Sequence, residues 1–235
     1  MIPIRDHNPT RSFAVVTALI IAANAVVFVA ELLFSGTMSN GAEQGLEQFF
    51  YTYGLVPCAL SGQCQGIPGS LPPWLTVLTA MFMHGGWLHI AGNMLYLWIF
   101  GNNIEDAMGP LGFTIFYLIC GVAASLAQVA IDPGSTIVNV GASGAIAGVL
   151  GAYLLLFPRA QVDTLVVLGW FARLVALPAA IVLGGWFVLQ LLSGLLSFGP
   201  ATAQGGVAFF AHIGGFVAGL LLVRVFTRRD FTPAV

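Results

Sequence analysis

Two polar residues in an otherwise apolar sequence have the chemistry of a nucleophile and its base. Ser143 stands in the segment Gly141-Ala-Ser143-Gly144, and His212 stands in an apolar stretch near the end of the chain. A serine hydroxyl is a poor nucleophile until a neighbouring base removes its proton, and a neutral histidine can do this without adding a second charge. The pair therefore predicts nucleophilic catalysis, provided that the fold brings the two side chains together.

His89 and Asn93 are candidate hydrogen-bond donors to a reacting group. They stand four positions apart in the sequence, which places both on one face of a helix. With the backbone N–H of Ser143, near a helix N-terminus, they would stabilise negative charge on a carbonyl oxygen under attack. No Asp or Glu stands where it would complete a triad, so a dyad of Ser143 and His212 is expected.

Each polar residue also has a structural interpretation. A glycine-flanked serine or a lone intramembrane histidine is more often a packing residue than a catalytic one. His84 and His89 could bind a metal, but no His-Glu-x-x-His pattern accompanies them, so we expect neither a metal nor another cofactor. We expect Gln190 to make an interhelical hydrogen bond without a further role, and Glu31 to reach water at the outer end of its helix.

The composition indicates what kind of structure positions these groups. Of the 235 residues, 58% are apolar and only 7% are charged, which lies outside the range of soluble globular domains. We therefore expect an integral membrane protein in contact with the lipid bilayer, with no nucleic-acid partner. No signal-peptide cleavage site follows the first apolar stretch, so this stretch is predicted to remain as a membrane span.

Glycine, proline and polar clusters divide the apolar sequence into stretches near the length of about 20 residues that a bilayer requires. The expected fold is an all-α, six-transmembrane-helix bundle over 13–227. An N-terminal segment 1–12 precedes it, a C-terminal tail 228–235 follows it, and residues 35–83 form an outward cap. The six spans are predicted near 13–34, 84–104, 111–131, 141–157, 174–196 and 206–227.

The basic residues indicate the orientation of this bundle. All seven are Arg, and with six spans every one falls on the side that the two termini share. The positive-inside rule therefore puts both termini in the cytoplasm and the cap outside, as in a prokaryotic plasma membrane. In this orientation His89, Ser143 and His212 lie at matched depth, near the outer ends of the second, fourth and sixth spans.

Further details concern the packing of the spans and the cap. Glycines four residues apart recur on the fourth and sixth spans and form small-residue faces that let helices approach closely. His212 stands three residues before Gly215, so packing these faces would bring its ring toward Ser143. Cys58 and Cys64 share the cap, where they could form a disulfide if it faces an oxidising compartment, or stay as free thiols.

Taken together, these segments resemble the rhomboid family of intramembrane serine proteases. The resemblance covers about 84 to 227, and its motifs occur in the family's order. The matching motifs are His84-Gly-Gly-Trp-Leu-His89-Ile-Ala-Gly-Asn93, Gly141-Ala-Ser143-Gly144 and Ala211-His212-Ile-Gly-Gly215-Phe-Val-Ala-Gly219.

The resemblance implies a serine endopeptidase that cleaves in or near the transmembrane helices of single-span membrane proteins. It implies Ser143 as nucleophile, His212 as general base and acid, and His89 with Asn93 as oxyanion stabilisers. It also implies that the fifth span is a movable gate. The chain departs from some members in two respects. The aromatic residue that supports the histidine ring is replaced by Ala147, so the ring must be positioned otherwise, and the Trp-Arg pair of the first loop is absent.

Two other functions stay open from the sequence. One is a non-proteolytic rhomboid-like protein that binds transmembrane helices, although such relatives usually lack the serine or the histidine. The other is a small transporter or channel, to which glycine-rich helices would also be suited, although no inverted repeat or intramembrane ion pair supports it. The physiological substrate and the oligomeric state do not follow from the sequence.

Overall fold

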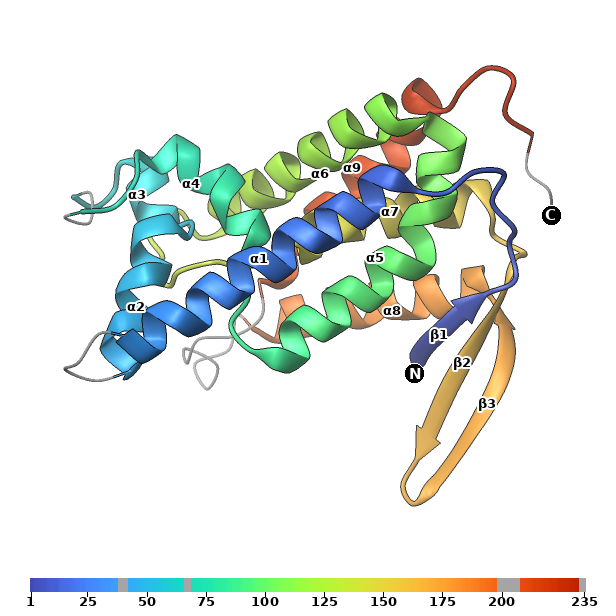
Figure 1. Cartoon of the computed structure of the whole chain (residues 1–235), viewed down its shortest axis with the longest axis horizontal. Helices are drawn as coiled ribbons and strands as arrows, with labels where there is room; N and C mark the ends of the chain where they lie inside the picture. Colours follow the sequence, from blue (N-terminus) through green and yellow to red (C-terminus); the bar gives the residue numbers. More distant parts are fainter. Residues whose placement is uncertain (38–41, 66–68, 198–207, 233–235) are drawn as a thin grey trace.

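Helices make up most of the structure, a computed structural model that describes residues 1–37, 42–65, 69–197 and 208–232 (Figure 1). The longer helices are α1 (Val15–Thr37), α5 (Trp87–Met108), α6 (Pro110–Ile131), α7 (Ser143–Leu156), α8 (Ala179–Leu196) and α9 (Phe209–Phe226). The region 35–83 contains α2 (Ala42–Tyr53), α3 (Pro57–Ser61), α4 (Pro73–Thr79) and the 3₁₀ turn η1 (Ala80–Phe82).

Several helices have the length and composition of membrane spans, so the protein is an integral membrane protein. Among the described residues, α6, α8, α9 and the Val15–Phe34 part of α1 are long and apolar enough to cross a bilayer. α7 is a shorter apolar helix of 14 residues. α5 has 22 residues, but polar and acidic residues near its C-terminal end make it less apolar.

The expected all-α fold class is wrong in one respect, because the described residues also contain a three-stranded antiparallel sheet. β1 (Ile2–Asp6) pairs with β2 (Gln161–Leu168), which forms a hairpin with β3 (Phe171–Pro178). The sequence predicts the fifth span from residue 174, whereas α8 begins only after Pro178. Short apolar runs rich in β-branched residues suit strands as well as helices, and hydrophobicity alone does not distinguish them.

α7 occupies the centre of the bundle, where every residue from Gly144 to Tyr153 is buried. A helix that is apolar on all sides is stable only when neighbours surround it, and α7 packs against α5, α6, α8 and α9. A Cβ at Gly215 would collide with the carbonyl oxygen of Gly144, and one at Gly219 with that of Gly148. The predicted glycine-mediated packing of the fourth and sixth spans is thus confirmed.

The turn predicted at 104–111 is shorter than expected, because α5 continues to Met108 and α6 begins at Pro110. Glu105, one of the two acidic residues in this segment, lies within α5 and caps the start of another helix. The Glu105 carboxylate accepts hydrogen bonds from the N–H groups of Val16 and Thr17 and from the Thr17 hydroxyl, at 2.7–2.9 Å. An acidic side chain at a helix N-terminus satisfies its free N–H groups, so Glu105 fixes the start of α1 against α5.

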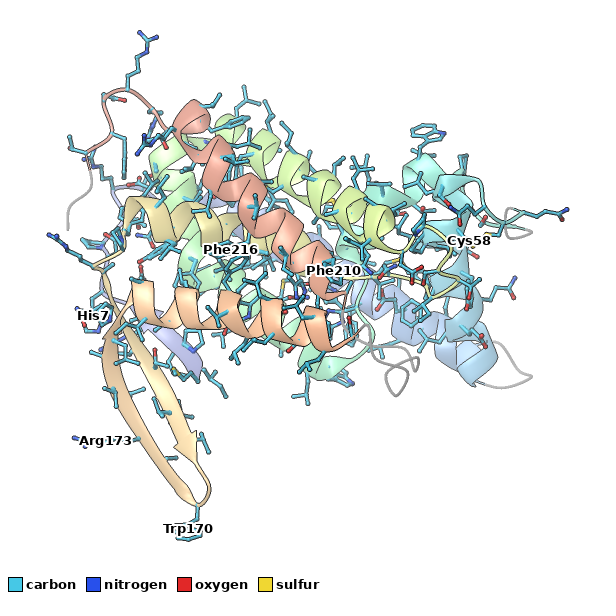
Figure 2. The ribbon with its side chains drawn as sticks, turned by 180° about the vertical axis from the view of Figure 1, so that it is seen from behind. His7, Cys58, Trp170, Arg173, Phe210 and Phe216 are labelled. Atoms are coloured by element: carbon cyan, nitrogen blue, oxygen red, sulfur yellow. A yellow bond between two sulfur atoms is a disulfide. The ribbon has the colours of Figure 1, made fainter. Side chains whose placement is uncertain are left out.

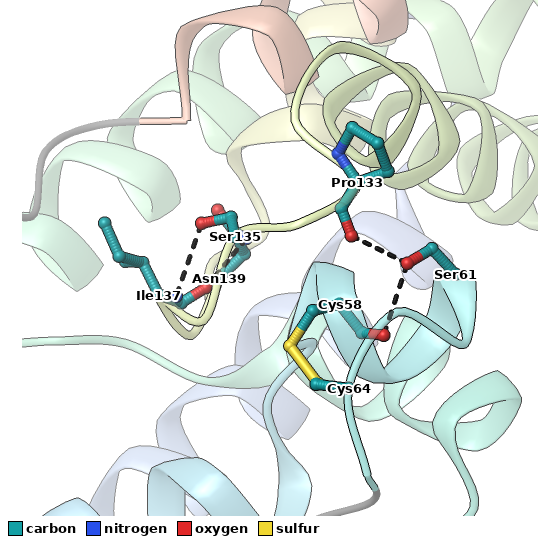
Figure 3. The surroundings of a disulfide bond; sticks show 7 residues. All are labelled: Cys58, Ser61, Cys64, Pro133, Ser135, Ile137 and Asn139. Carbon is teal, nitrogen blue, oxygen red and sulfur yellow. Dashed lines mark hydrogen bonds between the residues drawn. A yellow bond between two sulfur atoms is a disulfide. The ribbon is translucent and has the colours of Figure 1, made fainter.

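The cap makes hydrogen bonds to the loop that leads into α7 (Figure 3). Cys58 and Cys64 form a disulfide, which settles the alternative that the sequence leaves open. The Cys58 N–H donates to the carbonyl of Ser135 at 2.9 Å, and the Ser61 hydroxyl donates to that of Pro133 at 2.6 Å. The cap therefore holds the chain immediately before Ser143.

Candidate active site

Ser143 is the first residue of α7, and the segment before it pairs with the cap through an antiparallel bridge between Leu55 and Asn139. In the first turn of a helix the backbone N–H groups have no intrahelical acceptors, and the helix dipole places positive charge there. Gly141 approaches the serine with φ of 132°, a conformation that favours glycine. A Cβ at Gly141 would lie 2.8 Å from His89 Nε2 and 3.5 Å from Ser143 Oγ, so the motif brings these two side chains close together.

The His212 ring lies between Ser143 and a residue on another helix. Its Nε2 is 2.7 Å from Ser143 Oγ, and its Nδ1 is 2.8 Å from Gln190 Oε1 on α8. The amide oxygen of Gln190 can only accept a hydrogen bond, so Nδ1 must carry the proton. Nε2 of the neutral ring then has a free lone pair that accepts the hydrogen bond from the Ser143 hydroxyl.

The ring of His212 is supported from α8. Trp186, one turn before Gln190, has its ring centroid 5.7 Å from that of His212. Ala147, where some family members carry the supporting aromatic residue, is completely buried and presents only a methyl group. The structure thus shows how the ring is held without an aromatic residue at position 147.

His89 and Asn93 both line a cavity of about 700 Å³ that also contains Ser143, Trp186 and His212. The N–H of Gly85 donates to His89 Nδ1 at 3.2 Å, so the proton of the neutral ring lies on Nε2, the atom that is close to Gly141. Asn93 is buried, and among the described residues its side-chain nitrogen has no hydrogen-bond partner. The structure therefore places the side chains of His89 and Asn93 on the wall of the cavity that Ser143 and His212 also line.

Of two sequence expectations about neighbouring polar groups, the one for Glu31 is wrong and the one for Gln190 is confirmed. Glu31 does not reach water: it is 1% exposed, and its carboxylate accepts a hydrogen bond of 3.0 Å from the His84 N–H. Gln190 does make an interhelical hydrogen bond, as expected, but its partner is the candidate base itself. The sequence signal for Gln190 is that it is a polar residue in an apolar span. A polar residue in a span is costly, so it indicates a role in packing or function.

His84 packs its ring edge-on against His89, with centroids 5.0 Å apart. It lies outside the group that surrounds Ser143. Within the described parts of the chain, no group of three or more His, Cys, Asp or Glu side chains is placed to hold a metal ion. The polar side chains that line the cavity include a hydroxyl, two imidazole rings and an amide.

The fold and the cavity together define a helical membrane protein in which polar side chains from α5, α7, α8 and α9 meet inside the bundle. The sequence matches the Rhomboid domain over residues 72–229, a region that includes all of these side chains. The chain belongs to the rhomboid family.

Several relatives carry rhomboid names. Rhomboid-like protein 11, chloroplastic, from Arabidopsis thaliana is 32% identical over 157 residues, which are 66% of this chain and 53% of that protein. Rhomboid protein 1, mitochondrial, from Saccharomyces cerevisiae is 30% identical over 155 residues, 63% of this chain and 40% of that one. Rhomboid protease GluP from Bacillus subtilis is 40% identical over 81 residues, 34% of this chain and 15% of that one. The matches thus span about half the length of these relatives or less.

Proposed function

We propose that this protein is an intramembrane serine endopeptidase with six membrane spans, namely α1, α5, α6, α7, α8 and α9, and with both termini in the cytoplasm. The long apolar helices account for four spans, and α5 and α7 are the other two. α7 has 14 residues, a length of about 21 Å, which suits a helix whose N-terminus lies below the outer surface and beneath the cap. Ser143 then lies within the membrane but in contact with a polar cavity.

The contact of 2.7 Å between Ser143 Oγ and His212 Nε2 is the observation that carries the proposal. Ser143 Oγ attacks the carbonyl carbon of the scissile peptide bond while His212 Nε2 takes the hydroxyl proton. The Ser143 N–H, His89 and Asn93 stabilise the oxyanion that forms. His212 then protonates the leaving amine, and a water molecule activated by the same ring hydrolyses the acyl-enzyme.

The proposed substrates are single-span membrane proteins that are cut near the outer face of the membrane. A hydrogen-bonded helix shields its own carbonyl groups, so the substrate must unwind locally before Ser143 can reach its backbone. The cavity is lined by several residues of α5 and by Trp186 of α8, so both helices form part of its wall. The relative from Bacillus subtilis, named a rhomboid protease, supports this class of reaction.

Fluorophosphonate labelling and cleavage of a reconstituted single-span substrate test the proposal directly. The native chain should be labelled and should cleave, because a base-activated serine reacts with both. Ser143→Ala should lose both activities while the folded protein keeps its melting temperature. Ser12→Ala is the matched control, because Ser12 is exposed at the opposite end of the bundle and hydrogen-bonds Asp106.

Two results would overturn the proposal. Cleavage by Ser143→Ala at the native rate would show that Ser143 is not the nucleophile. A native chain that binds the substrate helix but neither cleaves it nor reacts with the fluorophosphonate would instead be a non-proteolytic rhomboid-like protein.

A further inference from the structure

His212, the candidate base on α9, contacts side chains of two other helices. His212 stands in the first turn of α9, and Ser143 stands at the start of α7. Trp186 and Gln190, one turn apart on α8, both contact this ring: Trp186 makes a tilted ring contact, and Gln190 accepts a hydrogen bond from Nδ1. The orientation of His212 therefore depends on α8, a helix that carries neither member of the pair.

α8 is held in place on the side that faces α9. Phe187 stacks on Phe216 with centroids 4.3 Å apart, and a Cβ at Gly194 would contact Phe209 and Phe210. On its other side α8 exposes Leu189, Leu192 and several further apolar residues, which suits contact with lipid. Gln190 lies between these two faces, where its amide can turn inward to the ring.

The hydrogen bond from Nδ1 to Gln190 selects one of the two neutral forms of the ring. Without an acceptor at Nδ1, the proton can move to Nε2, and the ring then presents a donor to Ser143 in place of a lone pair. A ring in that form cannot take the hydroxyl proton. The other titratable side chains that line the cavity are His89 and Tyr96 on α5, whereas the hydrogen bond at Nδ1 of His212 is made by Gln190 on α8.

We propose that Gln190 is a positioning residue of the catalytic unit, which keeps His212 in the tautomer and orientation that accept the Ser143 proton. Gln190 touches neither substrate nor reacting atom, so it acts through His212. Because Gln190 is carried on α8, the base is competent only while α8 is packed against α9. This inference rests on the proposed hydrolase function, and the experiment separates the two.

Gln190→Met tests the inference, because methionine has a similar volume and an apolar span tolerates it, but it offers no strong acceptor. We expect kcat to fall roughly 10- to 100-fold, by analogy with the loss of a hydrogen-bond partner that orients a metal-binding histidine, with KM within about 2-fold. The rate of fluorophosphonate labelling should fall by a similar factor. This probe does not require a transmembrane substrate, so the loss cannot come from substrate binding.

Gln190→Glu should restore most of the labelling rate, because a carboxylate also accepts from Nδ1. It should also favour the protonated ring, so the acidic limb of the pH–rate profile should move to higher pH. A residue that only packed α8 against α9 would not produce this shift. Leu192→Ala is the matched control on the same helix, because Leu192 is exposed, and it should leave both the rate and the profile unchanged.

The outcomes distinguish this inference from the proposed function. The role of Gln190 alone would be overturned if folded Gln190→Met kept the labelling rate and kcat of the native chain. It would also be overturned if the Met and Glu variants lost the labelling rate equally and the pH–rate profile of Gln190→Glu did not shift. If Gln190→Met did not fold, Gln190→Leu and the profile of Gln190→Glu would decide the same question. A native chain without labelling would overturn the proposed function instead.

Discussion

Asn93 and His89 differ in the hydrogen bonds that their side chains make. The Gly85 N–H donates a hydrogen bond to His89 Nδ1, so the ring proton lies on Nε2, close to Gly141. The buried side-chain nitrogen of Asn93 has no partner among the described residues. A buried donor without a partner costs about 1–3 kcal/mol, and such groups in native proteins often mark functional sites. A substrate oxyanion would supply the missing acceptor.

Asn93→Ala should lower turnover more than apparent affinity, since an oxyanion forms only as the reaction proceeds. In characterised serine hydrolases, loss of one oxyanion donor lowers turnover by ~10²–10³. His89 and the Ser143 N–H would remain here, so we expect the lower end of that range or less.

His212→Ala should abolish cleavage, because the Ser143 hydroxyl then has no proton acceptor.

Steady-state kinetics of both variants on one substrate, with fluorophosphonate labelling, measure this order. An Asn93→Ala variant changed only in apparent affinity would contradict the oxyanion role. A His212→Ala variant milder than Asn93→Ala would contradict the role of the base even if Ser143 proved to be the nucleophile.

Glu31→Ala should lower the thermal stability of the protein. The Glu31 carboxylate is the acceptor for the buried His84 N–H, and a buried donor left unpaired costs about 1–3 kcal/mol. The loss should also reduce activity, because Gly85, the next residue, donates the hydrogen bond that orients His89. Thermal unfolding in detergent measures the first effect and labelling the second. Glu47→Ala, at an exposed site on α2, is the control, and an equal change in both variants would refute this account.

At the scale of elements, the helices that carry the site meet through glycine. Gly144 and Gly148 on α7 face Gly215 and Gly219 on α9 with almost no space between the two backbones. Small residues permit this approach in a bilayer, where helix association depends on close packing. The close approach places the first turn of α9, and with it His212, beside the first residue of α7.

Gly215→Ala should destabilise the bundle and slow catalysis, because the new methyl group would collide with the Gly144 carbonyl oxygen. Overpacking of this kind typically costs about 1–3 kcal/mol. Gly184→Ala on α8 is a matched control, because nothing lies within 4 Å of the added Cβ and alanine favours a helix over glycine. Melting temperature and labelling rate should fall in the first variant only. Equal stability of the two variants would contradict the packing argument.

The sequence allowed these helix contacts to be predicted because glycine spacing is local, and the polar residues of the cavity could be located because few polar residues occur in the spans. The sheet could not be predicted in this way. β1 and β2 pair across more than 150 residues, with Arg5 opposite Asp163, and nothing local reports such a partner. The position of Gln190 against His212 likewise depends on how α8 turns around its axis, which a nearly uniform apolar helix does not reveal.

At the scale of the whole molecule, the two ends of the bundle differ in structure and charge. The sheet, with His7 and Arg173, lies at one end and Cys58 in the cap lies at the other (Figure 2). At the sheet end Asp163 binds His7 and Arg5 at 3.0 and 2.8 Å. Hydrogen bonds from His7 and then Arg5 hold the pKa of Asp163 below its ordinary value, so the carboxylate keeps its charge to lower pH than a free aspartate does.

The charge distribution predicts which end faces the cytoplasm, since arginine-rich segments stay on that side. Single cysteines can test this with a membrane-impermeant thiol reagent, because Cys120 is buried and Cys58 is paired with Cys64. Trp170→Cys, at the fully exposed tip of the β2–β3 hairpin (Figure 2), should react only after the cells are lysed. Glu47→Cys, on the exposed surface of the cap, should react on intact cells.

The native chain is the control and should show little labelling in either condition. The reverse pattern, with Trp170→Cys accessible from outside, would place the cap and the cavity on the cytoplasmic side. Ser143 would then face cytoplasmic rather than external cleavage sites, and the proposed position of the cut in the substrate would be wrong. Labelling of both cysteines from outside would be incompatible with a helical bundle that crosses the membrane between the sheet and the cap.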